Sequence, residues 1–93
     1  MTVVIKRNSR KEKFDEKKIK RSIDAAAKEA DIPEARRKGL VERVAVEMIE
    51  YAKKEKEVRA LDLREKILAR LDSIEPSVAN SWRDFDRESK GLA

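Results

Sequence analysis

Three basic side chains near the start of the chain have the types and the spacing needed to bind a polyphosphate. Lys6 and Arg7 end a short apolar run, and Lys18 lies in the first turn of a predicted helix. The N-terminus of a helix presents unpaired N–H groups and a partial positive charge, and both attract anions. If the apolar run and the start of the helix lie side by side, these groups converge on one hollow that suits a triphosphate.

Glu12 differs from its neighbours because it places a carboxylate inside this basic segment. It can form an ion pair with Lys11 or Lys13 on the face of a strand, which the spacing alone favours. It can also accept a hydrogen bond from an amino group such as that of adenine. The residues by themselves leave both roles open.

The distribution of charge along the chain favours an anionic partner. Residues 1–22 carry nine basic and three acidic side chains, whereas the remainder carries 15 basic and 16 acidic ones. The excess positive charge of the chain therefore belongs to its N-terminal segment. Such a patch attracts a nucleotide, a nucleic acid or an acidic protein surface, and the plain alternative is a solvated basic face.

Composition narrows the class of protein. The 93 residues suffice for one domain, 1–93, with a mostly aliphatic core. The sequence contains no cysteine and no histidine, the commonest general base and metal ligand, so we expect neither enzyme activity nor a protein-bound metal. Lacking a long apolar run or a signal peptide, the protein is expected to be cytoplasmic. Its charged fraction of 46%, rich in Lys and Glu, is typical of thermophiles.

The elements that must position the basic residues can be predicted from the hydrophobic pattern. It indicates an α+β fold in which a short N-terminal β-hairpin, over about residues 2–14, packs on a bundle of four helices. Asn8 and Ser9 suit a two-residue hairpin loop. Such a loop places Val3, Ile5 and Phe14 together on the face of the hairpin that points toward the core.

Helical periodicity places the four helices at about residues 15–30, 33–53, 60–74 and 76–89. Asp15 is suited to cap the first helix and Asp31 the second, with Pro33 in the first turn of the second. Val58, between the second and third helices, is expected to be briefly extended. The last helix carries three core candidates, Val78, Trp82 and Phe85.

One segment of the chain is similar to a known family. An ordered series of residues runs without a gap through Val4, Ile5, Lys6, Arg7, Arg10, Glu12, Phe14, Asp15, Lys18, Ile19, Ser22, Ile23 and Ala26. In order and spacing this series resembles the start of an ATP-cone domain, the allosteric nucleotide-binding module usually found at the N-terminus of ribonucleotide reductases. The later helices fit the outline of that family more loosely.

The resemblance implies a hairpin lid over a helical bundle that binds ATP or dATP, with magnesium as an accompanying ion. Lys6 and Arg7 would meet the phosphates, Lys18 would contact the nucleotide, and residues 12–15 would wrap the base and ribose. The start of the third helix would close the site. The nucleotide-binding residues implied are Val4, Lys6, Arg7, Glu12, Asp15, Lys18, Arg59 and Arg64.

The sequence departs from the family pattern at two places. Asn8 and Ser9 stand where the family has an Asp-Gly turn, which alters the tip of the lid. Ala60 stands where a polar residue is expected, although Arg59 and Arg64 could supply charge to the phosphates. These departures bear on whether nucleotide binding is retained.

The function expected from these observations is that of a non-catalytic regulatory domain for ATP or dATP. Because neither a reductase nor a cysteine zinc ribbon accompanies it, the domain is expected to act in trans on a separate enzyme or regulator, with ligand-dependent homo-oligomerisation as one route. A small nucleic-acid-binding protein is the first alternative, although no exposed aromatic is interleaved with the basic residues for base stacking. The second is a cone-like interaction module that has lost nucleotide binding.

Overall fold

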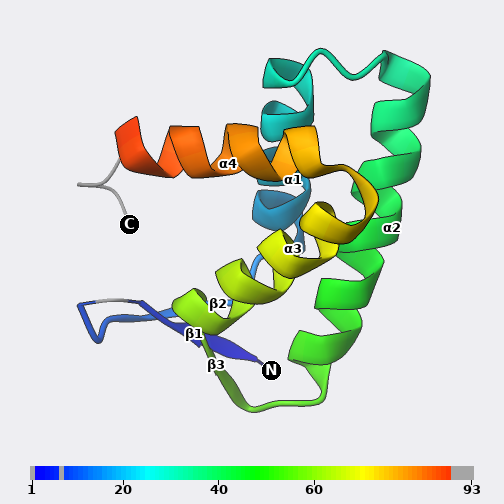
Figure 1. The fold of residues 1–93 in the computed structure, drawn as a ribbon. Coiled ribbons are helices and arrows are strands. Elements are labelled where there is room, and N and C mark those ends of the chain that lie inside the picture. The colour runs from blue at the N-terminus through cyan, green and yellow to red at the C-terminus, as the bar shows by residue number, and fades with distance from the viewer. Residues whose placement is uncertain (1, 7, 89–93) are drawn as a thin grey trace.

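The computed structural model describes residues 2–6 and 8–88, and the side chains of these as far as residue 84. Three short strands and four helices follow one another along the chain. Figure 1 shows the strands together at one end of the helices, with α3 leading directly out of β3. The α+β class predicted from the sequence, with an N-terminal hairpin on four helices, is confirmed.

The sheet contains one strand more than the predicted hairpin. Strand β1 (Val3–Ile5) lies in the middle, antiparallel to β2 (Lys11–Lys13) and parallel to β3 (Glu57–Arg59). In β3 the central Val58 is 4% exposed, whereas its two neighbours are exposed. The residue that the sequence marked as briefly extended is therefore the centre of a third strand.

The hairpin loop is one residue longer than predicted. The backbone N–H of Lys6 donates to the carbonyl of Arg10, and the N–H of Ser9 donates to the carbonyl of Lys6, both at 2.8 Å. Three residues therefore separate Lys6 from its partner Arg10, and Ser9 takes a left-handed conformation with φ 69°. A turn closed by a left-handed residue is a common three-residue hairpin loop.

The longer loop also corrects the predicted face of the hairpin. Val3 pairs with Lys13 and Ile5 with Lys11, while the N–H of Phe14 donates to the carbonyl of Thr2 at 3.0 Å. Because adjacent residues of a strand point to opposite faces, Phe14 lies on the face opposite to Val3 and Ile5. The prediction that these three side chains share a face was wrong, since a one-residue change of register exchanges the faces.

The helices begin and end at recognisable local signals. Their bounds are α1 Glu16–Glu29, α2 Glu34–Lys53, α3 Ala60–Ile74 and α4 Pro76–Glu88. Asp15 caps α1, as predicted, by accepting from the N–H groups of Lys17 and Lys18. Asp31 does not cap α2, whose N-cap is Pro33 without a side-chain bond.

Asp31 instead ends α1. It adopts a left-handed conformation with φ 60°, its N–H donates to the carbonyl of Lys28, and the N–H of Ile32 donates to the carbonyl of Ala27. This pair of bonds is a Schellman motif. The local sequence suited both roles, and the need to satisfy the last carbonyls of α1 decided between them.

The four helices share one aliphatic core. Ile23, Val44, Leu71 and Val78, one from each helix, have the largest fully buried side chains. Trp82 is partly buried against this core, in agreement with its predicted role, whereas the side chain of Phe85 lies outside the described residues. The core fixes the start of α1 and the start of α3 relative to the sheet.

Candidate nucleotide-binding site

The inner face of the sheet, which points toward α1, changes from apolar to charged along its length. Val4, Glu12 and Val58 lie side by side on this face, because Val4 pairs with both of the others. The neighbouring pair, Lys6 and Arg10, lies on the same face by the alternation of the strands. Charged side chains on the inner face of a sheet are unusual, and here they meet the first turn of a helix.

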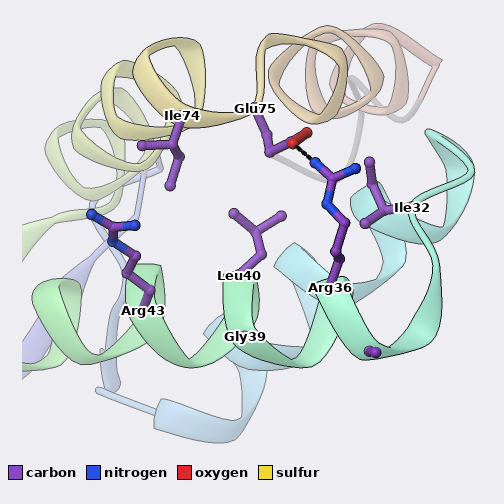
Figure 2. Close-up of a pocket in the computed structure, with 8 residues that line it drawn as sticks. Ile32, Arg36, Gly39, Leu40, Arg43, Ile74 and Glu75 are labelled. Carbon is purple, nitrogen blue, oxygen red and sulfur yellow. Dashed lines mark hydrogen bonds and ion pairs between the residues drawn. The ribbon is translucent and has the colours of Figure 1, made fainter.

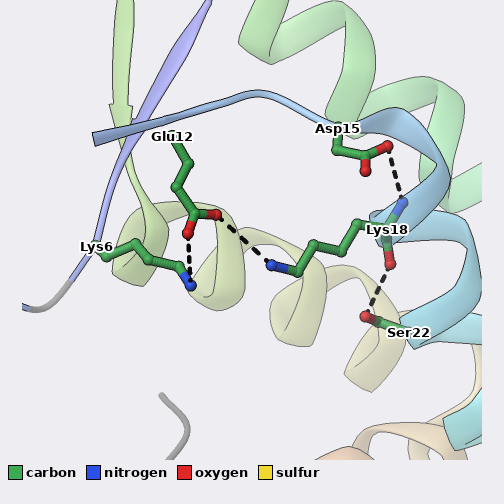
Figure 3. Close-up of polar contacts among 5 residues, drawn as sticks. All are labelled: Lys6, Glu12, Asp15, Lys18 and Ser22. Carbon is green, nitrogen blue, oxygen red and sulfur yellow. Dashed lines mark hydrogen bonds and ion pairs between the residues drawn. The ribbon is translucent and has the colours of Figure 1, made fainter. Parts of the chain in front are cut away.

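Lys6, Arg10, Glu12 and Lys18 form what we call the Glu12 cluster. Lys6 Nζ lies 3.2 Å from Glu12 Oε2, and Lys18 Nζ lies 3.8 Å from Glu12 Oε1. Figure 3 shows the two lysines approaching the carboxylate from different sides, one from the sheet and one from α1. The side chains of Lys6, Glu12 and Lys18 are 31%, 47% and 58% exposed, so the cluster is open to solvent.

The cations of the cluster lower the pKa of the Glu12 carboxyl. The hydrogen bond from Lys6 is the largest cause, partial desolvation opposes it, and the charges of Lys6, Lys18 and Arg10 add to the lowering. Glu12 is therefore held as a carboxylate at neutral pH. Arg10 was not among the predicted site residues, although its position two residues before Glu12 on a strand was the signal that both share a face.

Two of the N–H groups in the first turn of α1 already donate to the capping side chain. Asp15 Oδ1 accepts from the N–H of Lys17 at 2.9 Å and from the N–H of Lys18 at 3.3 Å. The sequence suggested that N–H groups at this end of the helix would bind a phosphate. In the structure, those of Lys17 and Lys18 donate to the carboxylate of Asp15 instead. The cations that remain for an anion at this end of the helix are those of the side chains, Lys18 above all.

The predicted pairing of Glu12 with Lys11 or Lys13 does not occur. Lys11 Nζ lies 2.9 Å from Glu57 Oε2, on the outer face of the sheet, beside Val3 and Ile5. Glu12 projects from the inner face and binds Lys6 and Lys18. Adjacent residues of a strand point to opposite faces of the sheet. The side chains of Lys11 and Lys13 therefore lie on the face opposite to that of Glu12.

The other predicted site residues are placed as follows. Val4 lies beside Glu12 at the centre of the sheet. Arg59 pairs with Ile5 in the register, on the outer face, and its guanidinium binds Asp62 at 2.9 Å, a hydrogen bond that raises the pKa of Arg59. Arg64 is half-buried in α3 and engaged within the molecule. Arg7 lies outside the described residues.

Thr2 holds the hairpin in place and was missed by the sequence argument. Its hydroxyl lies 2.9 Å from the carbonyl of Ala52 and 3.1 Å from that of Glu55, at the end of α2. The N–H of Val3 donates to the carbonyl of Lys56 at 2.9 Å. These bonds tie β1, and with it Lys6, to the end of α2.

A separate hollow, which we call the α2 cavity, lies between α2 and the junction of α3 with α4. It has a volume of about 380 Å³ and is lined by Ile32, Ala35, Arg36, Gly39, Leu40, Arg43, Ile74 and Glu75. Figure 2 shows Arg36 and Arg43 at opposite ends of Leu40, with Arg36 paired to Glu75. None of the residues predicted to bind a nucleotide lines this cavity.

Neither a cluster of metal ligands nor a membrane-spanning helix occurs among the residues that the structure describes. Across residues 2–6 and 8–88, no group of three or more acidic side chains gathers as a metal site would require. Within the same ranges, every helix is too short or too polar to cross a bilayer.

The chain is similar to a known domain family and to a known regulator. The model of the ATP cone domain matches residues 2–88. The transcriptional repressor NrdR of Gloeobacter violaceus is 32% identical over 92 residues, an alignment that covers 99% of this chain and 52% of the repressor. The chain thus spans about half the length of this curated relative.

Proposed function

Because the chain belongs to the ATP-cone family, we propose that it is a non-catalytic regulatory domain that binds ATP or dATP at the Glu12 cluster. The observation that carries this proposal is the approach of Lys6 and Lys18, from different elements, to a single anionic group. Ammonium groups that converge in this way are suited to the oxygens of a polyphosphate.

The chemistry of the cluster supports a nucleotide rather than a bare phosphate. Lys6, Arg10 and Lys18 carry three positive charges against the single negative charge of Glu12, which leaves an excess for a triphosphate. An ionised Glu12 can only accept hydrogen bonds, and the amino group of adenine is a donor. Val4, beside Glu12, offers an apolar surface to a base.

A regulatory role is supported by what the side chains can do. The whole sequence lacks histidine and cysteine, and the cluster consists of ammonium, guanidinium and carboxylate groups. These groups bind and orient a nucleotide, and none of them is an activated nucleophile. The NrdR relative is a transcriptional repressor, which is a regulator by its name.

The proposal extends to the way in which binding is transmitted. A ligand that draws the hairpin and α1 together changes the surface that they share, and this surface then binds a second copy or a separate enzyme or regulator. Light scattering with and without ATP tests this part. A mass that is the same in both conditions would leave nucleotide binding without this route of transmission.

The experiment that tests the binding site is a titration of the 15N-labelled protein with ATP and with dATP, followed by two-dimensional NMR. Amide signals of residues 4–18 are expected to move, while those around Gly39 in the α2 cavity stay in place. Constant signals in residues 4–18 at millimolar nucleotide would refute the proposal. If only the amide signals of residues in the α2 cavity moved, the nucleotide would bind in that cavity instead.

A nucleic-acid-binding function is the second candidate, and the basic excess of residues 1–22 favours it. Binding of this kind neutralises several phosphates and therefore weakens steeply as salt is added. Mobility of single- and double-stranded DNA at low salt separates the two functions. Unchanged DNA mobility with intact ATP binding would leave the nucleotide function alone.

A further inference from the structure

We propose that Glu12 is a built-in competitor of the phosphates, and that a polyphosphate binds this site only by displacing its carboxylate from Lys6 and Lys18. The inference rests on the proposed function and concerns the regulation of the same site. It assigns to Glu12 a role in the free protein that is separate from any contact with a base.

The geometry of the carboxylate carries the inference. One oxygen, Oε2, faces Lys6 at 3.2 Å, and the other, Oε1, faces Lys18 at 3.8 Å. Glu12 thus bridges the two ammonium groups as a bound anion would, and Figure 3 shows it between them. Carboxylate and phosphate oxygens are both hydrogen-bond acceptors, so they compete for the same donors.

The fold allows this competition because the three residues come from different elements. Lys6 follows β1, Glu12 lies on β2, and Lys18 belongs to the first turns of α1. Glu12 is 47% exposed, so its side chain can rotate into solvent without a change in the core. A rotation of one exposed side chain is enough to exchange the internal anion for an external one.

The competition has a consequence for selectivity. A displaced carboxylate loses two charge-assisted contacts and stays close to a polyphosphate of the same sign, which is unfavourable. A ligand that offers the carboxylate a new donor, as an adenine amino group does, restores part of this loss. Inorganic tripolyphosphate has no donor of this kind, and inosine triphosphate carries a carbonyl oxygen in place of the adenine amino group, so neither ligand restores the loss in this way.

The test compares E12Q with a matched control, E57Q. Each substitution removes the negative charge of a half-exposed glutamate on a strand, and each glutamate forms an ion pair with a lysine. The difference is that Glu57 binds Lys11 on the outer face of the sheet. Calorimetric titration with sodium tripolyphosphate is carried out at one fixed, low ionic strength. E12Q is expected to bind it about five-fold more tightly than wild type, and E57Q to stay within about two-fold.

The second measurement uses ATP and inosine triphosphate on the same three proteins. Wild type is expected to prefer ATP, and E12Q to lose much of that preference because inosine triphosphate binds it more tightly. Two-dimensional NMR spectra of the free variants verify that the fold is kept.

The outcomes separate the inference from the proposed function. If wild type binds ATP but E12Q binds tripolyphosphate no better than E57Q does, the role as competitor is overturned and the proposed function stands. If wild type fails to bind ATP while E12Q gains tripolyphosphate binding over E57Q, the competitor role stands and the proposed function falls. If none of the three proteins binds either ligand, both are overturned.

Discussion

The Glu12 cluster and the α2 cavity both contain basic side chains, but they arrange these side chains in different ways. In the cluster, cations from the sheet and from α1 converge on one carboxylate. In the cavity, both arginines come from α2, and Arg36 is already paired with Glu75. The cavity is a hollow of about 380 Å³, whereas the cluster has the converging donors.

This difference teaches that concavity and affinity for an anion are separate properties. A hollow lined by Ile32, Leu40 and Ile74 offers apolar contact, whereas a polyphosphate needs several donors aimed at one point. Convergence requires residues from elements that are distant in sequence. The following experiments test this distinction, from the largest expected effect to the smallest.

Removal of the converging lysines should have the largest effect. Lys6→Ala or Lys18→Ala is expected to weaken ATP binding by about 1–3 kcal/mol, as the loss of a charge-assisted hydrogen bond does. Arg43→Ala, the control in the α2 cavity, is expected to leave the affinity unchanged. Calorimetry on the three variants measures this. If only Arg43→Ala lost affinity for ATP, the nucleotide site would lie in the α2 cavity and not at the Glu12 cluster.

Substitution of the glycine in the α2 cavity should change stability but not ATP binding. A Cβ added at Gly39 meets nothing within 4 Å, so Gly39→Ala is expected to raise the free energy of unfolding by about 0.5–1 kcal/mol through its helix propensity. Urea denaturation measures the change, and an ATP titration supplies the control. A weaker affinity for ATP in this variant would connect the cavity to the nucleotide site.

The opposite substitution at the hairpin tip should have a smaller effect. Ser9 has φ 69°, a conformation that glycine adopts without steric cost, so Ser9→Gly is expected to raise the free energy of unfolding by about 0.5 kcal/mol. Ser22→Gly in the middle of α1 is the control and should lower it by a similar amount. If both variants changed the free energy of unfolding in the same direction, the conformation of Ser9 would not be the cause of the effect.

The smallest effect concerns the pH dependence of stability. The pKa of Glu12 in the folded protein lies below its usual 4.5, so its ion pairs stabilise the fold above that pH. This contribution is lost as the pH falls through the lowered pKa. Wild type should therefore be more stable than E12Q at pH 7, and the difference should shrink in acid. Urea denaturation at a series of pH values measures the free energy of unfolding of both proteins. A difference between them that stayed constant with pH would contradict the prediction.

Much of the helical fold could be predicted because its signals are local. Asp15 caps α1 as its position before the periodic run indicated, and each helix contributes apolar residues to one core. The hairpin was predicted as an element, but its loop and register were not, because Asn8 and Ser9 suit loops of two or three residues. Asp31 similarly fitted a helix start and a helix end.

The nucleotide-binding role of the predicted site residues stays a prediction, but the structure shows where most of them lie. The structure brings together Lys6, Glu12 and Lys18, which belong to the series that begins at Val4. Arg59, which was expected because the start of the third helix would close the site, lies on the outer face of the sheet. Strand β3 is far from β1 in the sequence, and no local pattern around Val58 indicated that the two strands pair.

By itself, the sequence determined which side chains are present, where the helices form and that the positive charge is concentrated near the N-terminus, since these follow from composition and short-range periodicity. The tertiary structure alone decided that Glu12 bridges Lys6 and Lys18 and that Arg59 lies on the outer face of the sheet. The physical reason is that strand register and the approach of distant elements are set by packing of the whole core, and a shift of one residue reverses the face on which every strand side chain lies.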